Sequence, residues 1–424
     1  MIRIAPSRRP SPVCDLAYRV LIMLSAAFAV ACWPAAGHAA DPGPYVALGD
    51  SYTAAPLIPF PGDGPPFCLR STSNYPSIVA RTLPASRYRD VSCSGASTDD
   101  MSRRQPYSEN DPQLDALGAE TRLVTLGLGF NDAKIGQILT GCPLRGLLQP
   151  SGTACRDFFT AGGQDAQAQA ITDTAPKFAT VLREIHERAP RARVIVLGYP
   201  SIVPNDGRSC FLLAPLSPDD LRYFDELLVK LNAMLATAAA GHDAEYADSY
   251  FSSIGHDVCT APGTKWWEGA IPTAPAYPWH PNALGEQHLA RTILKVLARP
   301  RPAPVLSALA AVSPRIRPGT KPRLSFELNR AATVTIVFRR QVKGRLQGGR
   351  CRPASAANRR GRSCERRSRV LRTVRVQGSP GINRLTVSAS RLTTPGLYRV
   401  TATATGDERA GMPQTTSFRV TRAR

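Results

Sequence analysis

The sequence Tyr45-Val46-Ala47-Leu48-Gly49-Asp50-Ser51-Tyr52 places an apolar run directly before a glycine and two short polar residues. Such a run, ended by glycine, is typical of a buried strand that enters a turn. Similar runs recur along the chain, and segments with helical spacing of apolar residues lie between them. Strands that alternate with helices predict an α/β domain on a parallel sheet. We expect strands at 45–48, 88–92, 123–126, 193–197 and 244–247, and helices at 75–82, 166–188, 218–240 and 282–298.

The pattern changes after a proline-rich connector, Arg299-Pro300-Arg301-Pro302-Ala303-Pro304. Beyond it, polar and apolar residues alternate in short runs separated by glycine and proline, which predicts a small all-β sandwich of the immunoglobulin-like kind. The segment 339–369 is crowded with arginine and glycine, and we expect it to be an extended loop. The predicted organisation is a leader at 1–40, an α/β domain at 41–299, a linker at 300–304 and a β domain at 305–424.

The first forty residues have the layout of a secretory signal peptide. Arginines precede an apolar run at 20–33, and the segment ends Gly37-His38-Ala39-Ala40. We therefore expect a secreted protein, cleaved near Ala39 or Ala40 and able to associate with the cell surface. An uncleaved membrane anchor and a lipidated Cys32 are the alternatives.

Eight cysteines follow this leader. An even number behind a signal peptide predicts disulfides. No two cysteines form a Cys-x-x-Cys pair and none lies beside paired histidines, so a zinc site is not expected. The sequence leaves their connectivity open. Pairing of nearest neighbours gives Cys68–Cys93, Cys142–Cys155, Cys210–Cys259 and Cys351–Cys364.

The positive charge belongs to one end of the chain. Residues 301–424 hold 27 Lys and Arg against 4 Asp and Glu, whereas residues 1–300 have a net charge of −2. An anionic cell-envelope polymer or lipid surface is the expected partner of the β domain. Nucleic acid is not expected, because the β domain has few aromatic residues and no stacking motif. The alternative is a solvated basic face without a specific partner.

Four short blocks carry residues suited to acyl transfer. Ser51 follows the first strand, where a helix start would offer main-chain N–H groups to a developing oxyanion, although Ser is also a common helix cap. Gly95 follows the second strand and Asn131 the third, and each is also typical of an ordinary turn. His280 stands just before the last helix, and histidine is the common general base because its ordinary pKa suits neutral pH.

Taken together, and in this order, Gly-Asp-Ser, the glycine, Gly-x-Asn-Asp and His-Pro-Asn resemble the SGNH/GDSL hydrolase family over roughly residues 45–298. The cysteine layout looks like its secreted actinobacterial lipase and phospholipase branch. The resemblance implies a three-layer α/β/α flavodoxin-like sheet of order 2-1-3-4-5. It also implies Ser51 as nucleophile, His280 as base, and an oxyanion hole formed by the N–H groups of Ser51 and Gly95 and the side chain of Asn131.

Two positions depart from the family pattern. Many members have Asp three residues before the histidine, where this chain has Tyr277. We therefore expect a Ser–His dyad whose imidazole is oriented by a main-chain carbonyl, that of Tyr277 or a neighbour. Glu268, the nearest preceding acid, lies on another loop segment. Phe130 replaces the second glycine of the usual Gly-Gly-Asn-Asp block.

The expected activity is hydrolysis of a carboxylic ester, preferably of a lipid or acylglycerol, without a metal or organic cofactor. A polysaccharide deacetylase is the alternative within the same chemistry. A catalytically inactive cell-envelope binding protein is the alternative from another class.

Overall fold

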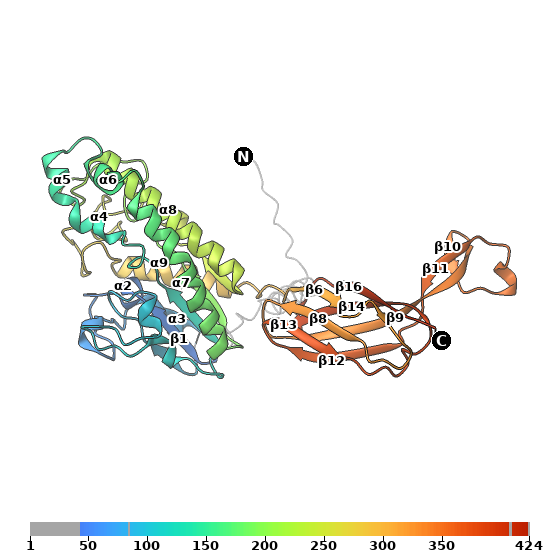
Figure 1. Ribbon diagram of the computed structural model, residues 1–424. Coiled ribbons are helices and arrows are strands. Elements are labelled where there is room, and N and C mark those ends of the chain that lie inside the picture. Colours follow the sequence, from blue (N-terminus) through green and yellow to red (C-terminus); the bar gives the residue numbers. More distant parts are fainter. Residues whose placement is uncertain (1–42, 84, 407–408, 423–424) are drawn as a thin grey trace, which may run out of the picture. The chain divides into compact units, whose positions relative to one another are not determined.

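A computed structural model describes residues 43–83, 85–406 and 409–422 (Figure 1). The expected leader and its cleavage site lie outside these residues. Within them, the helices are too short or too polar to cross a membrane.

The first half of the described chain forms a five-stranded parallel sheet. Its order is β2-β1-β3-β4-β5, so the predicted α/β fold and strand order are confirmed. The side chains of β1 and β3 are buried throughout, as expected of strands covered on both faces. The strands are β1 (Tyr45–Gly49), β2 (Tyr88–Asp90), β3 (Leu123–Gly127), β4 (Arg193–Leu197) and β5 (Ala244–Ala247).

Helices cover both faces of this sheet (Figure 1). The chain moves from β1 to β2 in one direction and from β3 through β5 in the other, so right-handed crossovers place the connecting helices on opposite faces. Helix α7 packs against α8, and α3 packs against α9. The longer helices are α3 (Tyr75–Thr82), α7 (Ala166–Arg188), α8 (Pro218–Gly241) and α9 (Ala283–Leu297).

Short elements complete this part of the chain. A helical segment that the sequence analysis did not anticipate lies between β3 and α7, where Pro143 starts the second of three short helices. The disulfide Cys142–Cys155 joins the second and third of them. The short elements are α2 (Ser51–Ala54), α4 (Gly136–Gly141), α5 (Pro143–Leu148), α6 (Ala154–Thr160), η1 (Pro66–Cys68), η2 (Asp99–Met101), η3 (Gln113–Ala116) and η4 (Phe251–Ser253).

The chain after α9 forms two sheets around a second core, and their strands pair antiparallel except for the parallel pair β16 and β7. One follows the path β10-β9-β14-β16-β7, with β11 and β12 paired to β9 and β15 paired to β14, and the other is β13-β8-β6. Buried side chains from both sheets, such as Phe326 and Phe338, fill the space between them. The strands are β6 (Leu306–Ala311), β7 (Arg315–Ile316), β8 (Arg323–Leu328), β9 (Ala332–Gln347), β10 (Arg350–Arg352), β11 (Ser363–Arg367), β12 (Arg372–Gly378), β13 (Gly381–Thr386), β14 (Gly396–Gly406), β15 (Arg409–Ala410) and β16 (Gln414–Val420).

The expectation of an extended loop at 339–369 is wrong. Strand β9 continues through this segment to Gln347 and pairs with β10 and β11, and the turn η5 (Ala356–Asn358) lies between those two strands. Main-chain pairing needs no apolar side chains, so a ladder can form in a segment that lacks the strand pattern. We call residues 339–369 the arm.

Candidate active site

Ser51 begins α2 directly after β1. The preceding Asp50 caps this helix, because its carboxylate accepts from the Tyr52 N–H (2.9 Å) and from the Tyr199 hydroxyl (2.5 Å). Burial raises the pKa of Asp50 to about 7. Gly49 makes the turn possible, since a Cβ atom there would stand 2.5 Å from the Gly127 carbonyl oxygen.

His280 comes from the other end of the domain, yet its Nε2 lies 2.8 Å from the Ser51 Oγ. Its other ring nitrogen, Nδ1, lies 2.7 Å from the Pro278 carbonyl oxygen. A carbonyl can only accept, so Nδ1 carries the proton and the Nε2 lone pair is free to accept from the Ser51 hydroxyl. The predicted nucleophile and base therefore form a hydrogen-bonded pair in the correct tautomer for proton transfer.

The orienting carbonyl belongs to Pro278 rather than to Tyr277, the residue predicted first. The Tyr277 carbonyl is occupied by a turn, because it accepts from the His280 main-chain N–H (3.1 Å). Proline at the second position of this turn, and Trp279 with φ of 65° at the third, match the signature of a type II turn. The middle peptide of the turn then directs the Pro278 carbonyl to the imidazole.

Aromatic rings enclose the imidazole. Tyr52 and Tyr277 lie with ring centroids 5.0 and 5.3 Å from that of His280, and the Tyr52 hydroxyl donates to the Trp279 carbonyl (2.5 Å). Burial lowers the pKa of His280 to about 4, against a smaller opposing effect of the hydrogen bond to Pro278. The imidazole is thus neutral, and able to accept a proton, well below neutral pH.

Glu268 supports the loop that carries His280 without bonding to its ring. Its main-chain N–H donates to the His280 carbonyl (3.0 Å), and its carboxylate accepts from the Asn282 amide (2.8 Å). Lys265 places its Nζ 3.1 Å from this carboxylate, and both side chains are fully buried. A buried ion pair of this kind fixes the loop on both sides of the histidine.

Gly95 and Asn131 lie at neighbouring strand ends. The Cys93 N–H donates to the Gly49 carbonyl (3.0 Å), and the Asp50 N–H donates to the Gly127 carbonyl (2.9 Å), so the segments after β2 and β3 flank the start of α2. Gly95 has a φ of 79° and is exposed. The Asn131 amide donates one hydrogen to the Ala96 carbonyl (2.8 Å), which leaves its second hydrogen for another acceptor.

Phe130, which stands where the family block usually has a second glycine, packs beneath the site against Tyr199. Its ring lies 5.3 Å from that of Tyr199, and its N–H donates to the Tyr199 hydroxyl (3.1 Å). Tyr199 therefore connects the Asn131 loop to Asp50. Tyr199 was not predicted from the sequence, because a tyrosine after a strand carries no distinguishing signal.

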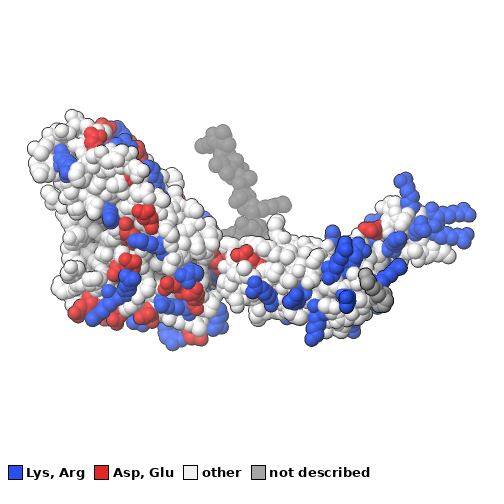
Figure 2. Space-filling model, in the orientation of Figure 1, with Lys and Arg blue, Asp and Glu red and all other residues white. Residues whose placement is uncertain are grey.

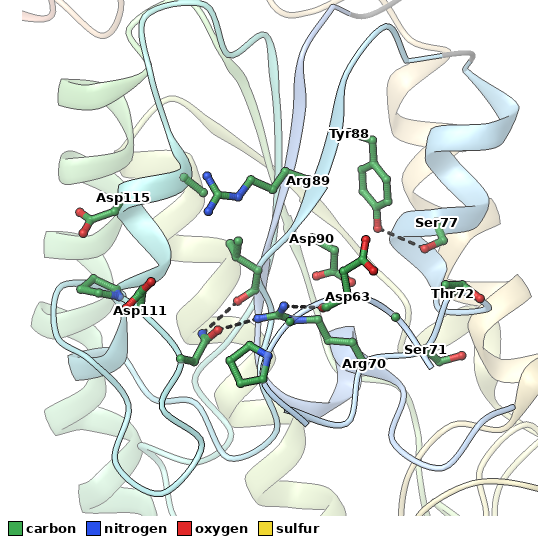
Figure 3. Close-up of a pocket in the computed structure, with 17 residues that line it drawn as sticks. Asp63, Arg70, Ser71, Thr72, Ser77, Tyr88, Arg89, Asp90, Asp111 and Asp115 are labelled. Carbon is green, nitrogen blue, oxygen red and sulfur yellow. Dashed lines mark hydrogen bonds between the residues drawn. The ribbon is translucent and has the colours of Figure 1, made fainter. Parts of the chain in front are cut away.

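Arg70 holds the segment before Gly95 and was also missed. Its guanidinium donates to the carbonyl oxygens of Ser92 (2.5 Å) and Asp63 (2.8 Å) and to the Asn110 side chain (2.6 Å). Figure 3 shows this side chain among the residues that line a pocket of about 580 Å³, which come from segments 62–65, 70–72, 88–91, 110–112 and 115–116 and from Ser77. Neither Ser51 nor His280 lines this pocket, so we assign it no part in catalysis.

The described cysteines pair as nearest neighbours. The first disulfide ties η1 to the strand end that precedes Gly95, where the Ser94 N–H also donates to the Cys68 carbonyl (3.1 Å). The disulfides are Cys68–Cys93, Cys142–Cys155, Cys210–Cys259 and Cys351–Cys364.

Known proteins resemble the first domain. Lipase 2 of Streptomyces coelicolor is 41% identical over 256 residues, which cover 60% of this chain and 85% of that protein. The lipase of Streptomyces rimosus is 32% identical over 245 residues, which cover 57% of this chain and 82% of that protein.

A solved structure, phospholipase A1 from Streptomyces albidoflavus, superposes with a TM-score of 0.50 at 26% identity and covers 60% of this chain and 98% of its own. The family model of the GDSL-like lipases and acylhydrolases matches residues 47–288, which span more than half of the chain. The resemblance seen in the sequence is thereby confirmed: this chain belongs to the GDSL-like lipase/acylhydrolase family and is a hydrolase of carboxylic esters.

Proposed function

We propose that the protein hydrolyses lipid esters through an acyl-enzyme on Ser51, with His280 as general base. The observation that carries this proposal is the 2.8 Å hydrogen bond between Ser51 Oγ and His280 Nε2. As Oγ attacks the ester carbonyl carbon, its proton passes to Nε2. The imidazolium then protonates the leaving alcohol, and a water activated by the same imidazole releases the acid.

The oxyanion of each tetrahedral intermediate needs hydrogen-bond donors. We assign this role to the main-chain N–H groups of Ser51 and Gly95 and to the free amide hydrogen of Asn131. The Pro278 carbonyl stabilises the imidazolium through Nδ1–H, as a carboxylate does in a triad. The proposed machinery is therefore a dyad with main-chain support.

Replacement of the nucleophile tests this proposal. Ser51→Ala should lower kcat/KM on a soluble p-nitrophenyl ester by several orders of magnitude with an unchanged circular dichroism spectrum, because the acyl-enzyme cannot form. His280→Ala should be comparably damaging, since the two residues act as a unit. Turnover near the wild-type rate in either variant would refute the assignment.

Two observations support a lipid substrate. The relatives named lipase and phospholipase act, by those names, on lipid esters. In α5 the side chains of Leu144, Leu147 and Leu148 are exposed at 66%, 61% and 73%, and their spacing places them on one helix face. A series of esters with acyl chains from acetyl to long-chain discriminates between a lipid esterase and a deacetylase. A lipid esterase should show higher kcat/KM with longer chains. A preference for acetyl esters would support the deacetylase alternative.

The protein is also proposed to be exported. Its disulfides are typical of an oxidising compartment. The protein recovered outside the producing cell should have its N-terminus at or next to Asp41, as N-terminal sequencing would show. A cell-associated protein that still begins at residue 1 would favour the uncleaved membrane anchor. The basic β domain would then hold the enzyme at an anionic surface.

A further inference from the structure

The arm concentrates the charge of the β domain. Residues 339–369 contain 12 Lys and Arg, all but Lys343 being Arg, against a single acid, Glu365. Figure 2 shows these cations at the end of the domain that carries β10 and β11, whereas positive and negative side chains are mixed on the visible face of the first domain.

Strand alternation sorts the arm's side chains onto two faces. Even-numbered residues of β9, such as Val334 and Phe338, point into the sandwich core, so odd-numbered ones face solvent. On the arm, the even face carries the disulfide Cys351–Cys364. This disulfide crosses β9 at Gly344, where any side chain would collide with it, because a Cβ atom would stand 2.9 Å from the Cys351 sulfur.

The odd face carries a row of cations. Arg339, Lys343 and Arg345 lie along β9 on this face, and three arginines of neighbouring strands lie beside them in register. We call this row the cationic track: Arg339, Lys343, Arg345, Arg352, Arg367 and Arg399. From Arg339 to Arg345 it extends about 20 Å, at roughly 3.3 Å per residue.

Like charges stand directly opposite one another in the cationic track. Arg399 pairs with Arg339 across one pair of strands, and Arg352 pairs with Arg345 across another. Such neighbours destabilise a sheet unless other groups offset their repulsion. Arg339 and Arg345 donate to the carbonyl oxygens of Ser368 (3.2 Å) and Gly361 (3.1 Å). Lys343 stands opposite Glu365, whereas Arg352, Arg367 and Arg399 remain exposed. A depression of about 130 Å³ adjoins the track at Gln341, Glu365, Arg366, Arg367 and Arg399.

The chemistry of the track indicates the kind of anion. Guanidinium groups bind phosphate oxygens in bidentate fashion, as they bind carboxylates, and this geometry favours both over anions that cannot offer two oxygens. The track follows β9 and includes residues of the strands on both of its sides, so it is about 20 Å long and about 10 Å wide, a shape that admits an extended single chain. Residues 339–369 contain no Phe, Tyr or Trp, so bases have no stacking partner. The exposed apolar side chain of β9, Leu346, lies on the opposite face and cannot insert into a bilayer beneath the track.

We propose that the cationic track binds an extended, single-chain polymer of phosphate esters that carries no bases. This inference rests on the proposed surface attachment and narrows it to one face of the arm and one class of partner.

A matched pair of full-length variants tests the proposal with long-chain inorganic polyphosphate as probe. The track variant is Lys343→Gln/Arg352→Gln/Arg367→Gln, and the control is Lys321→Gln/Arg323→Gln/Arg384→Gln. The control removes the same charges from exposed residues on and next to the β13-β8-β6 sheet. The track variant should bind polyphosphate about tenfold more weakly. The slope of the logarithm of its binding constant against the logarithm of salt concentration should become shallower by about two, because fewer counterions are released. The control should bind within about twofold of wild type, and both should hydrolyse a soluble ester normally.

The other outcomes separate the inference from the proposed function. Equal losses in both variants would overturn the track but leave surface attachment through overall charge. A full-length chain that binds no anion would overturn both. Tighter, track-dependent binding of phosphatidylglycerol vesicles or of single-stranded DNA would overturn the assigned partner.

Discussion

The two domains use charged and polar groups in opposite ways. In the first, buried polar groups are tied to main-chain atoms: Asp50 caps α2, Arg70 holds the Ser92 carbonyl, and Glu268 supports the His280 loop. In the β domain most of the cations are exposed, and the apolar core beneath them holds the sheets together. We therefore expect the first domain to depend on precise geometry and propose that the second acts through long-range attraction.

Apart from replacement of Ser51 or His280, the largest effect we expect concerns the precise geometry of the first domain. Asn131→Ala should lower kcat by about 10²–10³ with little change in KM, because the amide donates to an oxyanion present only in the transition state. Steady-state kinetics on a soluble ester measure both constants. A rise in KM at constant kcat would make Asn131 a substrate-binding residue instead.

The burial of His280 predicts an unusual pH profile. Protonated imidazole cannot accept the Ser51 proton, so kcat/KM falls as the pH drops through the pKa of about 4. At pH 5 a histidine of ordinary pKa would retain only about 3% of its basic form. The enzyme should instead keep most of its activity there. An acid limb centred near pH 6.5 would show that the imidazole is solvated and that the enclosure by Tyr52 and Tyr277 does not hold in solution.

The disulfides offer a direct contrast between the domains. Each closes a loop, of 25 residues for Cys68–Cys93 and of 13 for Cys351–Cys364, and each should stabilise its own domain by about 3 kcal/mol. Serine substitutions at Cys68 and Cys93 should lower kcat about tenfold as well, because the Gly95 segment loses its anchor. Substitutions at Cys351 and Cys364 should leave kcat unchanged. The comparison fails if both pairs of substitutions affect kcat equally.

The smallest expected effect is that of removing the β domain. A chain that ends at Ala298 should hydrolyse a soluble ester within about twofold of the full-length rate, since all four motif blocks precede that residue. Its binding to anionic vesicles or cell walls should weaken, and added salt should abolish the difference by screening. Loss of soluble-ester activity would mean that the β domain is needed for folding or packs against the site.

The sequence predicted the parts of the molecule that follow local rules. Periodicity gave helices such as Tyr75–Thr82 and Ala166–Arg188 with their observed bounds. It missed α4–α6, whose short helices depend on a proline start and on a disulfide. It also misjudged the arm, because a ladder of main-chain hydrogen bonds leaves no trace in side-chain alternation.

The proposed catalytic residues were predicted from motif blocks, but the contacts that hold them in place were not. The choice between the carbonyls of Tyr277 and Pro278 depends on the rotation of one peptide in a turn, which the positive φ of Trp279 sets. Arg70 and Tyr199 act through contacts between segments distant in sequence, so no local pattern marks them. These contacts exist only once the sheet has formed.

Covalent labelling tests the central claim, a reactive Ser51 activated by His280, most directly. A fluorophosphonate should add once per chain, and peptide mass spectrometry should locate it on Ser51. Labelling should disappear in Ser51→Ala and slow by several orders of magnitude in His280→Ala, because Nε2 no longer takes the hydroxyl proton. A label on another residue, or a rate unchanged by His280→Ala, would contradict the account.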